Sequence, residues 1–240
     1  MKKIEATIVL VRPQLPENIG LVARAMQNNG LNKLVIISPR EKWPNQKALK
    51  SSSNAKKIIQ NAKVFNSLEK GIEKYQLVIA TSARKRFLFN KYYHDFDLLF
   101  SNIPNVTNIA ILFGPENSGL TNKDMNLCDF IFTIPTSNKN TSLNLSHAVL
   151  IFAYKWKEFY SKNKIKKNDI NENISNKKNL LKFLNFLKIE LKKSGYLFPI
   201  QKSDSIFQNI QSIFMKAKLS PKEIQSLWGA LKSIAKPRKR

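Results

Sequence analysis

Hydrophobic residues in the first 160 positions form short continuous runs that alternate with segments of helical period. The runs are rich in β-branched residues, as is typical of strands buried on both faces. They lie at residues 4–11, 34–37, 77–81, 109–113 and 130–134. The helical period predicts helices over residues 18–29, 45–61 and 142–160. Alternation of this kind predicts an α/β domain with a parallel sheet flanked by helices.

The pattern changes after residue 160. Residues 161–178 are rich in Lys and Asn, with few large apolar side chains, which predicts an exposed linker. Helical period returns beyond it and predicts helices over residues 179–193, 204–218 and 221–235. We therefore expect an α/β domain over residues 1–160, a linker over 161–178 and a small α-helical domain over 179–240.

Charge adds a candidate partner. The chain has 41 Lys and Arg against 16 Asp and Glu, a formal net charge of +25. Residues 161–240 carry 19 of these cations and only 5 acids. Such an excess favours a polyanionic partner, either nucleic acid or an acidic membrane surface. Since 34 of the cations are lysines, the base composition of the genome is an alternative explanation of the excess. Of the two explanations, we favour an electrostatic role in binding.

Several classes of protein are excluded by the reactive residues. The single cysteine, Cys128, allows no disulfide framework and no thiolate zinc site. His94 and His147 have no metal-binding spacing, so we expect no metal. The first apolar run is interrupted by Glu5 and has no cleavage site, which predicts a strand and not a signal peptide. No run approaches 18 apolar residues, so we expect no membrane span and a cytoplasmic location.

The glycine pattern excludes two kinds of nucleotide site. No two of the seven glycines are spaced as G-x-G, as the dinucleotide-binding and Rossmann-type methyltransferase loops require. The segment 114–121 imitates a P-loop in spacing, but Leu120 stands where the phosphate-binding lysine must be. Glu116 within it would repel phosphate.

Candidate chemistry follows the carboxyl ends of predicted strands, where open α/β sheets bind ligands. The segments are RPQLPENIGLVAR at 12–24, LFGPENSGLT at 112–121, IPT at 134–136 continuing to NTSLNLSHA at 140–148, and TSARKR at 81–86. The N-I-G-x-x-x-R-A, F-G-P-E-x-S-G-L and S-L-N-L-S-x-A-V patterns resemble the three motifs of the SPOUT methyltransferase superfamily, SpoU/TrmH branch. The T-S-A-R-x-R segment and the basic helical tail are similar to the TrmJ group of that branch. The resemblance covers nearly the whole chain.

The resemblance implies an S-adenosylmethionine-dependent methyltransferase whose α/β domain contains a deep C-terminal trefoil knot. It also implies a homodimer with the site at the dimer interface. The substrate it implies is tRNA, methylated on a ribose 2'-hydroxyl at anticodon-loop position 32, on cytidine or uridine. Two alternatives stay open: a ribosomal RNA 2'-O-methyltransferase of the same superfamily, and a non-catalytic RNA-binding protein with this fold.

Residue roles come from the same resemblance. Nine residues are assigned to cofactor binding, most of them small enough for backbone amides to approach the cofactor closely. They are Thr81, Ser82, Ala83, Gly114, Glu116, Ile134, Thr141, Ser142 and Leu143. The catalytic candidates are Arg24, Ser142 and Asn144. A guanidinium essentially never loses its proton. We therefore expect Arg24 to stabilise the developing alkoxide or hold the adjacent phosphate rather than act as a base.

The remaining expectations concern loops and RNA. We expect Glu116 to tie down its own loop by accepting backbone N–H bonds, and Asn144 to hold its loop closed through bonds to backbone. The RNA-binding candidates are Arg12, Arg24, Arg84 and Arg86. The aromatic residues that follow them either stack on bases or pack in the core: Phe87, Phe89, Tyr92 and Tyr93. His147 lies on an apolar helix and is expected to be packed or at an interface rather than catalytic.

Overall fold

The computed structural model of the chain describes residues 4–83, 91–137, 142–162 and 173–235. Its centre is a sheet of seven parallel strands in the order β3-β2-β1-β6-β4-β7-β5. The strands are β1 (Glu5–Val11), β2 (Lys33–Ile37), β3 (Lys63–Phe65), β4 (Leu77–Thr81), β5 (Lys91–Tyr93), β6 (Asn108–Phe113) and β7 (Phe130–Phe132). All five predicted strands are present, and the parallel α/β architecture is confirmed. The trefoil knot stays a prediction.

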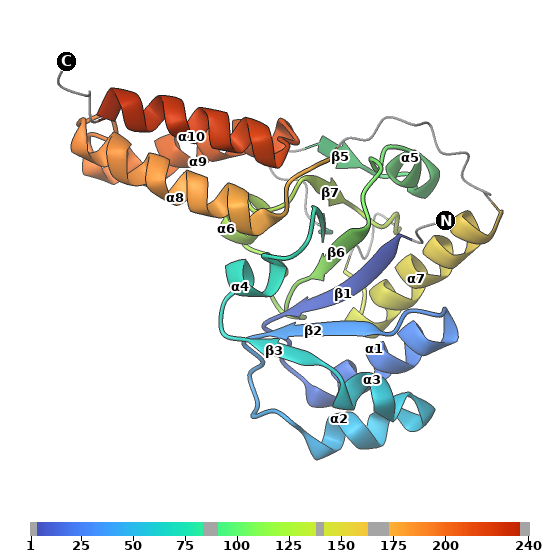
Figure 1. Ribbon diagram of the computed structural model, residues 1–240. Helices are drawn as coiled ribbons and strands as arrows, with labels where there is room; N and C mark the ends of the chain where they lie inside the picture. Colours follow the sequence, from blue (N-terminus) through green and yellow to red (C-terminus); the bar gives the residue numbers. More distant parts are fainter. Residues whose placement is uncertain (1–3, 84–90, 138–141, 163–172, 236–240) are drawn as a thin grey trace.

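Five helices cover one face of the sheet (Figure 1). They are α1 (Pro16–Asn28), α2 (Gln46–Ser51), α3 (Lys56–Gln60), α5 (Phe96–Ser101) and α7 (Leu145–Lys162). Strand residues such as Ile8 and Ile111 pack with Met26 of α1 and Phe152 of α7, all fully buried. The two helices α1 and α7 lie side by side on this face. Their first turns therefore bring the residues of the first and third motifs together.

The single helix predicted over residues 45–61 is wrong in one respect, because the segment is divided. A 3-10 turn, η1 (Ser53–Ala55), separates α2 from α3. The hydroxyls of Ser51 and Ser52 donate to carbonyl oxygens of the preceding turn, at Lys47 and Leu49. Serine hydroxyls compete in this way with helix continuation, and Ser53 then adopts a positive φ of 51°.

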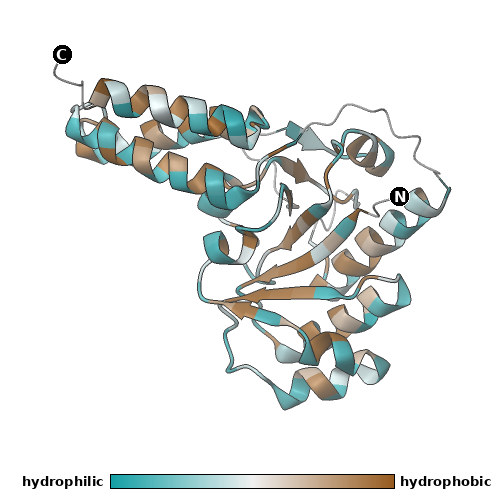
Figure 2. Cartoon of the chain, viewed as in Figure 1, coloured by the Kyte–Doolittle hydropathy of each residue, from teal (hydrophilic) through white to brown (hydrophobic). Residues whose placement is uncertain are grey.

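The opposite face of the sheet is covered by α4 (Leu68–Ile72), α6 (Asn122–Met125) and the tail helices. The tail consists of α8 (Lys177–Lys193), α9 (Ser203–Lys216) and α10 (Pro221–Ala235). Phe183 and Leu184 of α8 are buried in the same apolar cluster as Val78 and Leu112 of the sheet. Figure 2 shows this arrangement as apolar strands between helices whose outward faces are hydrophilic. The first tail helix is therefore part of the covering of the sheet.

A buried ion pair fixes the start of α8. Lys177 Nζ lies 2.7 Å from Asp129 Oδ1, and the two side chains are 3% and 6% exposed. Asp129 Oδ2 also accepts from the backbone N–H of Val78 at 2.7 Å. The expectation of an exposed linker through residue 178 is wrong at its end, because Ile174, Ser175 and Lys177 are buried and Gln76 Nε2 donates to the carbonyl of Ile174 at 3.0 Å. The division of the chain into two domains stays a prediction.

Candidate active site

A cavity of about 290 Å³ lies at the carboxyl ends of β4, β6 and β7. Segments far apart in the chain meet there. The lining residues are Thr81, Ser82, Ala83, Phe113, Gly114, Pro115, Glu116, Asn117, Ser118, Gly119, Leu120, Ile134, Ser142, Leu143, Leu145 and Ala148. Eight of the nine predicted cofactor-binding residues are among them; Thr141 lies outside the described residues.

The loop after β6 forms one wall of the cavity with its backbone. A Cβ placed on Gly114 would lie 2.3 Å from the backbone nitrogen of Leu120, closer than any side chain tolerates. Gly119 has a φ of +67°, which favours glycine, and its N–H donates to the Pro115 carbonyl at 2.8 Å. The two glycines thus let the loop close tightly on itself and expose backbone groups to the cavity.

A chain of side-chain hydrogen bonds joins the three sequence motifs. Asn18 Nδ2 donates to Glu116 Oε1 at 2.8 Å, and Asn18 Oδ1 accepts from Asn144 Nδ2 at 3.3 Å. Asn144 Oδ1 then accepts from the backbone N–H of Ser146 at 2.9 Å and from its hydroxyl at 2.7 Å. Asn144 therefore bonds to backbone as expected, at the start of α7. Asn18 was assigned no role from the sequence, although its place in the N-I-G motif was the available signal.

Glu116 also bonds to backbone, but its donors differ from those expected. The N–H of Gln14 donates to Oε2 at 2.9 Å and the N–H of Leu15 lies 3.4 Å from Oε1. Both donors precede α1 and belong to the first motif. The expectation that Glu116 ties down its own loop is wrong in this respect, because the carboxylate reaches across to the neighbouring loop and joins the two.

Arg12 lies at the end of β1 in an ion pair. Its guanidinium donates from Nη1 to Asp124 Oδ1 at 3.2 Å and from Nη2 to Oδ2 at 2.5 Å. Burial alone would raise the pKa of Asp124, but the hydrogen bonds from Arg12 and Thr121 outweigh it and hold this pKa below its ordinary value. The Arg12 side chain is 37% exposed, so part of it still faces solvent. Neither this pair nor the role of Asp124 was predicted.

Arg24 lies on the exposed side of α1 and does not line the cavity. Large apolar side chains are exposed on the same helix and on the neighbouring α7: Leu15 directly before α1, Leu21 on α1, and Leu150 and Tyr154 on α7, each at least 39% exposed. His147 is also exposed on α7, so the expectation that it packs within this chain is wrong; only the interface alternative remains. The reason is that it falls outside the apolar stripe of Leu145, Val149 and Phe152 that faces the sheet.

The other predicted RNA contacts are placed in part. Arg84, Arg86, Phe87 and Phe89 lie outside the described residues. Tyr93 is buried and packs edge-on against Phe130 with ring centroids 5.2 Å apart, so it packs in the core and does not stack on bases.

No group of three His, Cys, Asp or Glu in the described ranges could hold a metal ion. Within the same ranges, no helix combines the length and apolarity needed to cross a membrane.

The chain is similar to known proteins of one family. Residues 5–154 match the model of the SpoU rRNA Methylase family. The chain is 30% identical over 234 residues to the tRNA (cytidine/uridine-2'-O-)-methyltransferase TrmJ of Pectobacterium atrosepticum, covering 95% of this chain and 96% of the relative. Among solved structures, TrmJ from Z. mobilis ZM4 is 34% identical, with a TM-score of 0.85 over 96% of this chain and 99% of that one.

A more distant structure shares the fold alone. The SpoU methyltransferase AviRb from Streptomyces viridochromogenes, in complex with the cofactor AdoMet, is 18% identical. Its TM-score is 0.55 over 68% of this chain and 60% of that one. The family model spans the three motifs that the hydrogen-bond chain joins around the cavity. The chain therefore belongs to the SpoU rRNA methylase family, and it is a methyltransferase.

Proposed function

We propose that this methyltransferase transfers a methyl group from S-adenosylmethionine to a ribose 2'-hydroxyl of tRNA, at anticodon-loop position 32 on cytidine or uridine. The observation that carries the proposal is the hydrogen-bond chain from Glu116 through Asn18 to Asn144, which gathers three motifs around one cavity. Similarity to tRNA methyltransferases extends through the tail, over 95% of the chain. Because the similarity includes the tail, tRNA is favoured over ribosomal RNA as the substrate. A tRNA substrate in turn favours the cytoplasm as the place of action.

The cavity fits an adenosine-containing sulfonium cofactor. Apolar side chains of Phe113, Ile134 and Leu143 offer a surface for a flat base, and the backbone of the Gly114–Leu120 loop offers groups for polar atoms. A volume of about 290 Å³ is close to the lower end of the roughly 300–1,000 Å³ typical of ligand pockets. When bound, the cofactor supplies an already activated methyl group, so the reaction calls for no metal.

The protein then has to align the methyl acceptor and favour its negative charge. Glu116, Asn18 and Asn144 act as positioning residues, because their hydrogen bonds lock the cavity wall against the start of α1 and α7. Ser142 lines the cavity, which supports assigning it a contact with the reacting groups. We assign to Arg24 the stabilisation of the developing 2'-alkoxide or the holding of its phosphate.

In this scheme, Arg24 acts at the cavity only when two copies of the chain form a dimer. Arg24 stands on α1, and this helix and the neighbouring α7 expose Leu15, Leu21, Leu150 and Tyr154. An apolar surface exposed by two neighbouring helices favours a protein interface. A homodimer formed through it covers these side chains and brings Arg24 to the interface beside the cavity.

The test is methyl transfer by the purified chain to defined RNAs. Labelled S-adenosylmethionine is supplied with a tRNA transcript, with the same transcript carrying a 2'-deoxyribose at position 32, and with ribosomal RNA fragments. We expect label in the first alone, located at position 32 by mass spectrometry of nuclease fragments. Label in ribosomal RNA only would assign the ribosomal alternative, and RNA binding without label would assign a non-catalytic role.

A further inference from the structure

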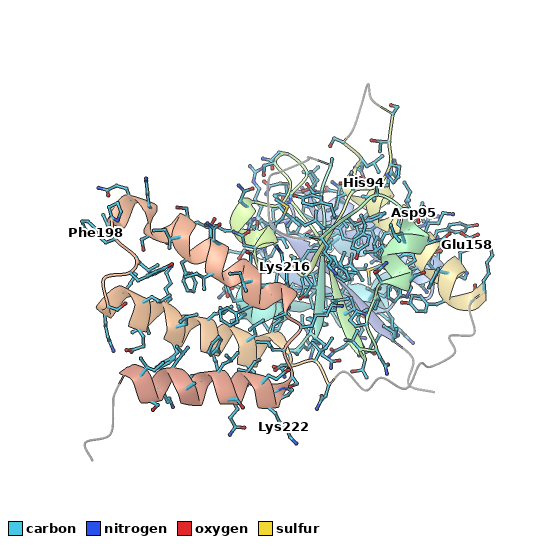
Figure 3. The ribbon with its side chains drawn as sticks, turned by 90° about the horizontal axis from the view of Figure 1, so that it is seen from above. His94, Asp95, Glu158, Phe198, Lys216 and Lys222 are labelled. Carbon is cyan, nitrogen blue, oxygen red and sulfur yellow. The ribbon has the colours of Figure 1, made fainter. Side chains whose placement is uncertain are left out.

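The turn between α8 and α9 exposes three large apolar side chains. Tyr196 is 60% exposed, Phe198 79% and Ile200 80%. Leu197 between them is 6% exposed and buried in the apolar cluster beneath the tail. Figure 3 shows Phe198 at the far end of the tail helices from the sheet. Tyr196 and Phe198 thus project on either side of an anchored residue.

The backbone of this turn is held in place. Gly195 ends α8 with a φ of +78°, and its carbonyl accepts from the N–H of Phe198 at 3.2 Å. The N–H of Lys202 donates to the Pro199 carbonyl at 2.9 Å and begins the approach to α9. The exposed rings are therefore presented by a defined conformation, which lowers the entropic cost of using them in binding.

The surroundings of the rings are basic. Lys192, Lys193 and Lys202 are exposed next to the turn. The nearby acids are already paired: Glu190 with Lys193 at 2.7 Å, and Asp204 with Lys188 at 3.2 Å. We call Tyr196, Phe198 and Ile200, together with Lys192 and Lys202, the tail tip; Lys193 is left out because its charge is matched by Glu190. Aromatic rings among cations match a nucleic acid, which offers base faces to the rings and phosphates to the lysines.

Helix α9, which follows the tail tip, contacts the sheet domain near α6. Met215, near the end of α9, lies beside the Lys177–Asp129 ion pair, while Gln211 Nε2 donates to the carbonyl of Asn126 at 3.2 Å. Following α9 back toward its start, the contacts thus move from the Lys177–Asp129 pair to Asn126, directly after α6. An α8 of 17 residues is about 25 Å long, which sets the tip well away from the ion pair.

We propose that the tail tip binds unpaired nucleotides of the RNA substrate by stacking their bases on Phe198 and Tyr196, at a distance from the methylated ribose. This inference rests on the proposed function and deepens it, since it makes the tail a reader of single-stranded RNA in addition to a source of charge. Stacking accepts every base, because each has a π-face. The tip therefore recognises the presence of an unpaired loop and not its sequence.

The test uses the full chain with the Phe198→Ala substitution and a tRNA transcript. Loss of one stacked base is expected to raise the Kd for tRNA about 5- to 150-fold. The salt dependence of binding stays as in the wild type because no cation is removed, and the Kd for S-adenosylmethionine is unchanged. Phe198→Trp keeps the wild-type affinity. Phe198→Leu weakens binding like Phe198→Ala, because it is apolar but has no ring.

Ile213→Ala is the matched control, since Ile213 is an apolar residue of α9 that is 63% exposed and outside the tail tip. It should leave the Kd for tRNA unchanged. Three results would overturn the inference: wild-type tRNA affinity in Phe198→Ala, wild-type affinity in Phe198→Leu alone, or a change of oligomeric state in Phe198→Ala by sedimentation, which would assign the tip to a second copy. A wild-type chain that neither binds nor methylates tRNA overturns the proposed function as well, whereas the first three leave it standing.

Discussion

Asn18 donates a hydrogen bond of 2.8 Å to Glu116, although 98 positions separate the two residues in the chain. The same carboxylate accepts from the backbone of Gln14 and Leu15. One acidic side chain of the second motif therefore holds the start of the first. Asn18 also bonds to Asn144, so the same network connects Glu116 with the third motif.

Glu116→Gln is expected to loosen this junction. A neutral amide accepts more weakly than a carboxylate, and its NH₂ end faces N–H donors that it cannot satisfy. Hydrogen bonds to charged groups contribute roughly 1.5–3 kcal/mol, so the free energy of unfolding in urea should fall by about that amount. The Kd for S-adenosylmethionine, measured by calorimetry, should rise by roughly an order of magnitude. Glu17→Gln, at the exposed acid directly before Asn18 on α1, whose carboxylate lies 3.8 Å from Lys47 Nζ, should change neither; equal effects at both positions would contradict the role of Glu116.

Lys177→Met tests the ion pair that fixes the tail to the sheet. The substitution keeps the apolar stem but leaves the carboxylate of Asp129 buried without its cation, with the Val78 N–H still donating to it. Breaking one partner of a buried pair typically costs about 3–5 kcal/mol. The free energy of unfolding in urea should fall by that amount. Lys178→Met, at the exposed adjacent position, should keep the free energy of unfolding within about 0.5 kcal/mol of the wild type. A wild-type midpoint in Lys177→Met would mean that the pair contributes nothing to docking α8.

Asp124→Asn should change how stability depends on pH. The folded pKa of Asp124 is lowered from 3.8 by Arg12 and Thr121 despite its burial. A depressed carboxyl pKa contributes stability that is present above the unfolded pKa and is lost as the pH falls through the folded pKa. The wild type should therefore exceed Asp124→Asn at pH 7, and the gap should shrink as the pH falls below about 4. Asp97→Asn, at an exposed acid of α5, is the control and should show no such convergence.

The fold could be predicted wherever an apolar pattern was long enough. All the longer strands and helices were found, including α10 with both of its bounds. The edge strands β3 and β5 and the short helices α4, α5 and α6 were missed because three to six residues are too short for a period to show. The docking of α8 was missed for a different reason. Its apolar stripe, with Leu180 and Phe183, has the same spacing whether it faces a sheet or other helices.

The site was predictable to the level of motifs and their common edge. Parallel strands end on one side of a sheet, so the segments after β4, β6 and β7 were expected to meet, and they line one cavity. Partners within the site were not predictable, because hydrogen bonds such as Asn18 to Glu116 and Arg12 to Asp124 depend on loop conformation. Glu116 shows the difference: its backbone-bonding role followed from its chemistry, but the identity of its donors did not.

Exposed lysines of the tail should set the salt dependence of RNA binding. Removing residues 173–240 is a poor test, because it would uncover Val78 and Leu112 on the face that α8 covers. Lys182→Gln combined with Lys222→Gln leaves that face intact, since both side chains are exposed. Each lost phosphate contact should lower the slope of log Kd against log salt by about 0.7–0.9. Lys56→Gln with Lys57→Gln, on exposed positions of α3, removes the same charge elsewhere and should leave the slope unchanged; equal slopes in both doubles would assign the tail lysines to composition alone.

Arg24 is the residue whose substitution should separate catalysis from binding. It is exposed on α1 and lies outside the cavity, so Arg24→Ala should leave the urea midpoint and the Kd for S-adenosylmethionine unchanged. Loss of a donor that stabilises transition-state charge lowers kcat by about 10²–10³-fold. Arg24→Lys keeps the charge but loses the planar fork that binds an oxyanion or phosphate through two N–H groups, and its kcat should still fall by about tenfold or more. Arg40→Lys, at another exposed arginine, is the matched control and should keep wild-type turnover. Most of the wild-type kcat retained in Arg24→Lys would rule out a two-point guanidinium contact and leave charge alone as the contribution of Arg24.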